Sequence, residues 1–364
     1  LYFQVLPPSA PLQIRPRGNN LLRQLQALSH GHGHNRTMES RLAQLQAFGI
    51  PTEFHAYEGL GHGFGLGTGT VAEGWIEDAV AFWEVQAGVQ QDAERNTLLT
   101  ASPTSEKQQV LYVWEEGKAP ATTVYTQNTG NYFDDPDFRP YVTTFPAAEG
   151  IPIKGAVVIC AGGAFQFRSD ANEGTPIALE LSRRGYQSFV LDYRLRPYTQ
   201  EEGALDLART VRFIRRHADE YGIDEKDIAV MGFSAGGILA GEMILHYRGG
   251  ITPDALDPSY VPDALDRVSA RVAADGMIYS FYGRLSVASM DLESLQEAGI
   301  PPTYYCYGTN DPFYRQFEAQ FSMLENAEEH VERLVLENWG HGFGSRGGWM
   351  EDYDRFLAKI FGNN

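Results

Sequence analysis

The segment Gly232-Phe233-Ser234-Ala235-Gly236 constrains the fold of this 364-residue chain more than any other. An apolar run at residues 228–231 precedes it, and residues 238–247 have the apolar spacing of a helix. A serine between glycines at such a strand-to-helix turn is typical of a nucleophile elbow, because larger residues would clash there. The dipole and free N–H groups at the helix start favour developing negative charge. The pattern therefore predicts a nucleophilic Ser234, whereas the alternative is an ordinary serine in a glycine-rich turn.

Apolar runs and helical patterns alternate around this turn. Strands are expected at residues 110–114, 141–145, 156–160, 189–193, 228–231, 272–281, 303–307 and 331–336, and helices at 175–184, 204–221, 238–247, near 313–327 and near 349–361. Strands that alternate with helical stretches of ten or more residues indicate a parallel sheet flanked by helices. The sequence thus predicts an α/β fold with a mostly parallel central sheet.

A serine hydroxyl is a weak nucleophile without a base, so a histidine and an orienting carboxylate are expected downstream. Asp311 lies in Asn310-Asp311-Pro312, just after the strand at 303–307, and His341 follows the strand at 331–336. Both positions are carboxyl ends of strands, where open α/β sheets place their ligands. Together with Ser234 they occur in the order Ser, Asp, His. We therefore predict Ser234, Asp311 and His341 as a catalytic triad, although each of the last two alone could be an ordinary loop residue.

The chemistry also needs backbone N–H donors for a developing oxyanion. Ala161-Gly162-Gly163-Ala164-Phe165 follows the strand at 156–160, and its small residues allow close approach of the backbone. We predict donors at Gly163 and Ala164, and at Ala235 directly after the nucleophile. The alternative is a plain Gly-Gly turn.

Composition excludes several other functions. The chain has 29 Lys and Arg against 47 Asp and Glu, for a net charge of −18. Such a surface repels phosphate backbones and anionic lipids, so neither nucleic acid nor membrane is an expected partner. The two cysteines, Cys160 and Cys306, are too few for a disulfide framework and lack the spacing of a zinc site. The sequence therefore predicts no metal site, and it favours a polar loop over a metal site at His30-Gly31-His32-Gly33-His34.

From about residue 108 to the end, the chain resembles an α/β-hydrolase-fold serine esterase. It is most similar to the bacterial branch of acetyl xylan and feruloyl esterases, relatives of the hormone-sensitive-lipase-like carboxylesterases. The resemblance is carried by these segments: Gly162-Gly163-Ala164-Phe165, Asp192-Tyr193-Arg194-Leu195, the elbow at 232–237, Asn310-Asp311-Pro312 and Gly340-His341-Gly342-Phe343-Gly344. One departure is Ala161, where such families often carry a histidine that supports the oxyanion loop. The resemblance implies hydrolysis of acyl esters without a cofactor.

The N-terminal third holds a partial repeat of the chain's end. Residues 40–84 contain Gly61-His62-Gly63-Phe64-Gly65, and residues 319–361 contain the same five residues at 340–344. We expect residues 1–4 to be a tag remnant, 5–107 an arm and linker, and 108–364 the catalytic domain. The arm could cap its own domain, reach a second subunit or be a relic of a tandem enzyme. We favour a homo-oligomer formed through the arm, in which His62 could contribute to a neighbour's site, although His341 remains the expected base.

The sequence as a whole predicts a cofactor-free serine carboxylesterase. Its expected substrates are short-chain or aryl acyl esters, such as acetyl or feruloyl esters of plant polysaccharides or oligosaccharides. The alternatives are an amidase or peptidase with the same triad, or a catalytically silent binding or assembly protein. No targeting segment is visible, so we expect a cytoplasmic protein or a secreted one whose signal has been removed.

Overall fold

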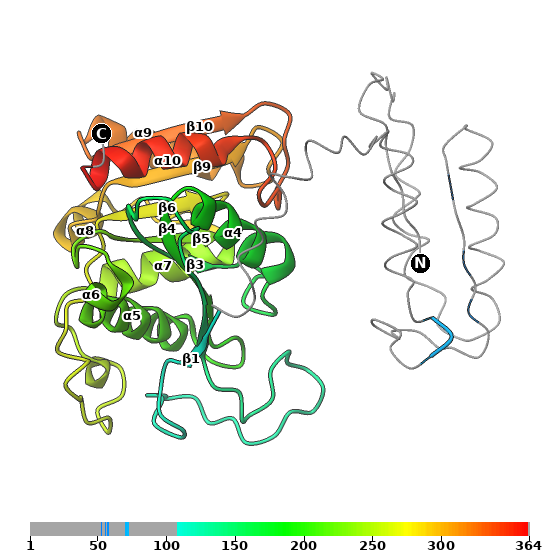
Figure 1. The fold of residues 1–364 in the computed structure, drawn as a ribbon, viewed down its shortest axis with the longest axis vertical. Helices are drawn as coiled ribbons and strands as arrows, with labels where there is room; N and C mark the ends of the chain where they lie inside the picture. The colour runs from blue at the N-terminus through cyan, green and yellow to red at the C-terminus, as the bar shows by residue number, and fades with distance from the viewer. Residues whose placement is uncertain (1–51, 53–54, 56, 58–69, 73–107, 363–364) are drawn as a thin grey trace. The chain divides into compact units, whose positions relative to one another are not determined.

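The computed structural model describes residues 52, 55, 57, 70–72 and 108–362 (Figure 1). The chain divides into two units, Leu1–Ala101 and Ser102–Asn364, and the account below concerns the second. The tag remnant, the histidine-glycine segment at 30–34, His62 and nearly all of the repeat at 40–84 lie outside the described residues. The expectations about the arm and about an oligomer therefore stay predictions.

Strands and helices alternate along the second unit, as the sequence predicts. They are β1 (Val110–Tyr112), β2 (Tyr141–Phe145), β3 (Gly155–Cys160), η2 (Asp170–Gly174), α4 (Thr175–Arg183), β4 (Tyr186–Asp192), α5 (Gln200–Arg216), α6 (Ala218–Tyr221), β5 (Ile228–Phe233), α7 (Ala235–His246), η3 (Pro253–Ala255), β6 (Ala274–Ile278), β7 (Gly283–Arg284), β8 (Val287–Ala288), α8 (Leu292–Ala298), β9 (Thr303–Gly308), α9 (Tyr314–Asn326), β10 (Val331–Leu336) and α10 (Trp349–Ile360).

Eight strands form one sheet in the order β1-β2-β4-β3-β5-β6-β9-β10. Six neighbouring strands pair in parallel, in the order β4, β3, β5, β6, β9 and β10. Strands β1 and β2 join them antiparallel at one edge. Cys160 at the end of β3 pairs with Gly232 of β5, and Phe233 pairs with Ile278 at the end of β6. The register thus brings the carboxyl ends of the central strands side by side. The expected α/β-hydrolase architecture, a mostly parallel sheet flanked by helices, is confirmed.

Helices cover both faces of the sheet (Figure 1). On one face α4 and α10 approach each other, since Arg184 lies 3.7 Å from Asp354 of α10. On the other face α7 and α9 both pack on Tyr282: a Cβ on Gly241 would lie 3.0 Å from its ring, and Gln320 donates to its carbonyl at 2.8 Å. Between these layers β3, β4, β5, β6 and β9 are buried along their whole length. Two buried faces explain their nearly continuous apolar sequence.

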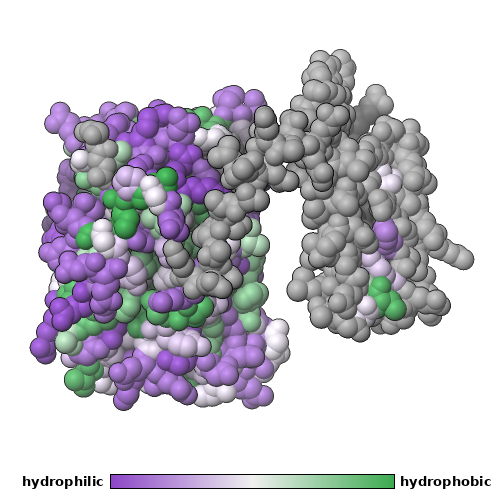
Figure 2. All heavy atoms as spheres, viewed as in Figure 1, coloured by the Kyte–Doolittle hydropathy of each residue, from purple (hydrophilic) through white to green (hydrophobic). Residues whose placement is uncertain are grey.

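Hydrophilic side chains cover much of the face of this unit drawn in Figure 2, and hydrophobic ones form smaller groups. Among the described residues, no helix is both long and apolar enough to cross a bilayer.

Helix α5 begins four residues before the predicted start at 204. The Thr199 hydroxyl accepts from the Glu202 N–H at 3.2 Å, and the Glu202 carboxylate accepts from the Thr199 N–H at 2.7 Å. This capping box satisfies two backbone donors of the first turn, which lets the polar residues 200–203 join the helix.

Candidate active site

Ser234 lies at the tight turn between β5 and α7. Its backbone angles, φ 50° and ψ −119°, are unusual for a residue with a side chain. The turn is held by its N–H, which donates to the Ile278 carbonyl at 3.0 Å. A Cβ on Gly236 would come 2.0 Å from the Cys160 carbonyl oxygen, and one on Gly232 would come 2.2 Å from the Gly237 nitrogen. The two glycines are therefore a steric requirement of the elbow, as the sequence pattern predicts.

The structure brings Ser234 together with His341 and Asp311. The His341 Nε2 lies 2.8 Å from the Ser234 Oγ, and its Nδ1 lies 2.6 Å from the Asp311 Oδ2. Asp311 follows β9 and His341 follows β10, so all three side chains sit at carboxyl ends of parallel strands. The Asp311 side chain is fully buried, and its second oxygen accepts from the Phe313 N–H at 2.8 Å. A buried, hydrogen-bonded carboxylate fixes the orientation of the imidazole.

The loop that carries two of the predicted oxyanion donors runs past this nucleophile. A Cβ on Gly162 would lie 3.0 Å from the Ser234 Cβ, so the loop after β3 runs directly past the serine. Within residues 108–362 and the short described stretches before them, the N–H groups of Gly163 and Ala164 donate no hydrogen bond. Ala235 is the first residue of α7, so its N–H has no acceptor inside the helix. None of the three N–H groups thus has a hydrogen-bond acceptor among the described residues.

Glu173, a residue that the sequence analysis did not single out, supports this loop. Its carboxylate accepts from the Gly162 N–H at 2.7 Å and from the Tyr279 hydroxyl at 2.6 Å. The side chain is 4% exposed, and burial raises its pKa, although the hydrogen bonds from Tyr279 and Gly162 and the nearby His341 oppose the shift. The loop lacks the histidine expected at position 161, but the Ala161 carbonyl accepts from the Tyr193 hydroxyl at 2.7 Å. The hydrogen bonds from the Gly162 N–H to Glu173 and from the Tyr193 hydroxyl to the Ala161 carbonyl thus hold the loop without a histidine at position 161.

Tyr279 connects Glu173 to the imidazole. Its ring centroid lies 4.8 Å from that of His341 and 4.6 Å from that of Phe343. Its hydroxyl also accepts from the Gly344 N–H at 3.3 Å. No local pattern reveals this arrangement, because Glu173 and Tyr279 are 106 residues apart. Only the β3–β5–β6 pairing brings them together.

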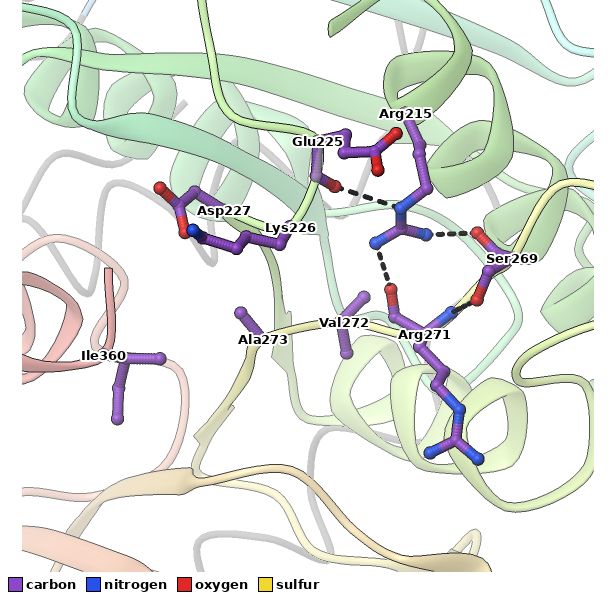
Figure 3. Close-up of a pocket in the computed structure, with 9 residues that line it drawn as sticks. All are labelled: Arg215, Glu225, Lys226, Asp227, Ser269, Arg271, Val272, Ala273 and Ile360. Atoms are coloured by element: carbon purple, nitrogen blue, oxygen red, sulfur yellow. Dashed lines mark hydrogen bonds between the residues drawn. The ribbon is translucent and has the colours of Figure 1, made fainter. Parts of the chain in front are cut away.

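A pocket at the opposite end of the sheet carries no comparable chemistry (Figure 3). Asp227 and Ala273 line it from positions just before β5 and β6, at the amino ends of these strands. Its Arg215 donates to the backbone carbonyls of Glu225, Ser269 and Arg271, so its guanidinium ties loops together. We therefore assign the functional site to the carboxyl ends.

Comparisons with known proteins agree with this architecture. Residues 144–250 match the family model BD-FAE. The chain is 30% identical over 148 residues to endo-1,4-beta-xylanase B of Butyrivibrio fibrisolvens, covering 39% of this chain and 23% of the relative. It is 24% identical over 219 residues to an acetylxylan esterase of Xylanibacter ruminicola, covering 57% of this chain and 45% of the relative. The matching part thus spans less than half the length of either relative.

A solved structure has the same fold. The acetyl ester-xyloside bifunctional hydrolase of Caldicellulosiruptor lactoaceticus aligns with a TM-score of 0.50 at 21% identity, covering 70% of this chain and 96% of that one. The expected resemblance is confirmed: the second unit is an α/β-hydrolase domain similar to the carboxylic ester hydrolases of the acetyl xylan esterase branch.

Proposed function

We propose that this protein is a serine carboxylesterase in which Ser234, His341 and Asp311 form the triad. The observation that carries the proposal is the continuous hydrogen-bonded chain from the Ser234 Oγ through His341 to the buried Asp311. Nucleophile, base and orienting carboxylate are the three parts that acyl transfer through a serine requires. The free N–H groups of Gly163, Ala164 and Ala235 supply the fourth part, the oxyanion donors.

The reaction proceeds in two halves. His341 Nε2 takes the Ser234 proton as the Oγ attacks the ester carbonyl, and Asp311 stabilises the imidazolium that forms. The oxyanion of the tetrahedral intermediate accepts from the three N–H groups. When the intermediate collapses, the C–O bond to the alcohol breaks and His341 returns the proton to the alcohol. Water then attacks the acyl-enzyme with the same base, which releases the acid and restores Ser234.

The proposed substrates are short acyl esters, with acetyl groups on plant polysaccharides as the main class. Support comes from the relatives named above, an acetylxylan esterase and an acetyl ester-xyloside hydrolase. Feruloyl esters are the second class, which a panel of acetylated and feruloylated oligosaccharides separates from the first. Aminoacyl amides in the same panel test the amidase alternative.

The test replaces the nucleophile and a matched serine. Ser234→Ala should lower kcat/KM for p-nitrophenyl acetate by at least about a thousandfold. Ser259→Ala removes an exposed serine that only caps a turn with Asp257, and it should keep wild-type turnover. A fluorophosphonate probe should label the wild type at Ser234. Wild-type-like turnover by Ser234→Ala would refute the nucleophile, and an unlabelled, inactive wild type would favour a silent binding protein.

A further inference from the structure

A second cavity lies at the same edge of the sheet as Ser234. It has a volume of about 470 Å³, and its walls come from the segments that follow β1, β3, β4 and β6. One wall is Phe165, at the end of the candidate oxyanion loop, whose carbonyl accepts from the Arg196 N–H at 3.0 Å. The cavity is therefore joined to the oxyanion loop by direct backbone contact. The loop that runs past Ser234 at Gly162 thus also forms a wall of this cavity at Phe165.

Arg196 gives the cavity an uncompensated positive charge. The side chain is exposed, and within the described residues its guanidinium has no hydrogen bond or ion pair. The other cavity arginine, Arg284, is already paired: it lies 2.6 Å from Glu201 and 3.8 Å from Glu242. Of the two cavity arginines, Arg196 is therefore the one without an ion pair among the described residues. It is available to a carboxylate, whose two oxygens match its planar fork of donors.

Aromatic side chains form the other walls. Tyr132 and Tyr198 line the cavity, and each packs edge-to-face on Tyr125, with centroid distances of 5.5 and 6.0 Å. Mutual packing restricts the rotation of these rings, so they provide fixed apolar surfaces beside the charge. Such a site accepts a ring-shaped group that carries an acid, with the ring against the tyrosines and the acid at Arg196.

We propose that this cavity binds a carboxylate-bearing part of the ester substrate, such as an acidic sugar, through Arg196. The inference rests on the proposed esterase function and adds the charge of the substrate to it. No covalent step is involved, because the carboxylate is held as an ion pair while the ester is cleaved at Ser234.

The test compares esters that differ only in charge. On the alcohol side, 3-carboxy-4-nitrophenyl acetate is compared with its carboxamide; on the acyl side, p-nitrophenyl hemiglutarate is compared with its carboxamide, the p-nitrophenyl ester of glutaramic acid. For each pair, the ratio of kcat/KM for the charged ester to that for the neutral one is measured. In one of the two pairs the carboxylate lies in the part of the substrate that occupies the cavity. For that pair, Arg196→Gln should lower the ratio about fivefold. Because ions screen an exposed pair, raising NaCl from about 0.02 to 0.5 M should reduce the wild-type ratio as well.

The control is Arg267→Gln, an exposed arginine with no ion pair among the described residues, in the segment before β6. It should leave both ratios at the wild-type value. Binding without turnover is measured by NMR titration of the Ser234→Ala variant, with and without Arg196→Gln. If neutral esters are hydrolysed but Arg196→Gln changes neither ratio, the cavity inference is overturned. If no ester is hydrolysed and Arg196 still strengthens binding of the carboxylate esters, the esterase proposal fails and the cavity assignment stands.

Discussion

Replacing Glu173 by glutamine tests how the oxyanion loop is held. The carboxylate accepts two hydrogen bonds, from the Gly162 N–H and the Tyr279 hydroxyl. A glutamine of the same shape has one acceptor oxygen. The Gly162 N–H can only donate, so the amide oxygen must face it, and the amide NH₂ then faces the Tyr279 hydroxyl. That hydroxyl already accepts from Gly344, so it loses the acceptor for its own proton.

The size of the effect follows from these two bonds. Hydrogen bonds to a charged group contribute about 1.5–3 kcal/mol, against about 0.5–1.5 kcal/mol for neutral ones. Losing the charge at both contacts costs about 2 kcal/mol, and the released desolvation cost of the buried carboxylate offsets about half of it. A net weakening of about 1 kcal/mol in the loop that carries Gly163 and Ala164 corresponds to about a fivefold loss of rate. Oxyanion donors bind the tetrahedral intermediate more tightly than the substrate, so the loss should appear in kcat rather than KM.

Steady-state kinetics on p-nitrophenyl acetate, with a thermal melt of each variant, measure the effect. The matched control is Glu318→Gln, because Glu318 also accepts from a tyrosine hydroxyl, that of Tyr307 at 2.6 Å, but lies on α9. Both variants should melt within a few degrees of the wild type, and only Glu173→Gln should lose kcat. A Glu173→Gln enzyme with wild-type kcat and a lowered melting temperature would show that the residue only stabilises the fold, which would refute the reasoning.

Two further predictions concern other residues. His341→Ala should abolish ester hydrolysis, whereas His62→Ala should retain most of it in the same assay; the opposite result would assign the base to His62. Asp275 on β6 is fully buried, and burial raises its pKa to about 7, although the Tyr282 hydroxyl and the Gly276 N–H oppose the shift. Because the folded state holds this proton more tightly than the unfolded one, stability should fall as pH rises from about 4 to about 7. In urea unfolding, the free energy of unfolding of Asp275→Asn relative to that of the wild type should therefore rise by about 2.5 kcal/mol between pH 5 and pH 8. A difference that does not change with pH would contradict the raised pKa.

Local sequence patterns predicted the elements well, and they selected three residues that the structure places within hydrogen-bond distance of one another. The bounds of β2 and β10 match the expected ranges, because strand-favouring residues end there at Pro146 and at Glu337-Asn338. Ser234, Asp311 and His341 could be selected because each directly follows a strand in a parallel sheet, where position along the chain implies position in space. Residues 282–298, which had no predicted structure, form the short β7, β8 and α8. Two-residue strands are too short to produce an alternating pattern.

Glu173 and Arg196 could not be found in this way. Glu173 is one acidic residue in a polar segment, and its role depends on Gly162 and on Tyr279, which follows β6. Arg196 is distinguished by its place in the cavity together with the ion pair that it lacks, while Arg284 in the same cavity has one. Both properties are set by long-range packing, which a single sequence does not encode in its local spacing.

The strained backbone of the domain is concentrated at the candidate site. Among the described residues, non-glycine residues with positive φ include Ala164, Phe165, Ser234 and Tyr279, which follow β3, β5 and β6. Each such conformation costs on the order of 1–3 kcal/mol and persists only where its surroundings enforce it. Here the enforcing structure is the buried centre of the sheet: β3, β5 and β6 are buried throughout, and the Ser234 N–H is bonded to the end of β6. Loosening these strands should therefore impair the geometry at Ser234 before the domain unfolds. The strained turns would relax first, because only the surrounding strands hold them in their unfavourable conformation.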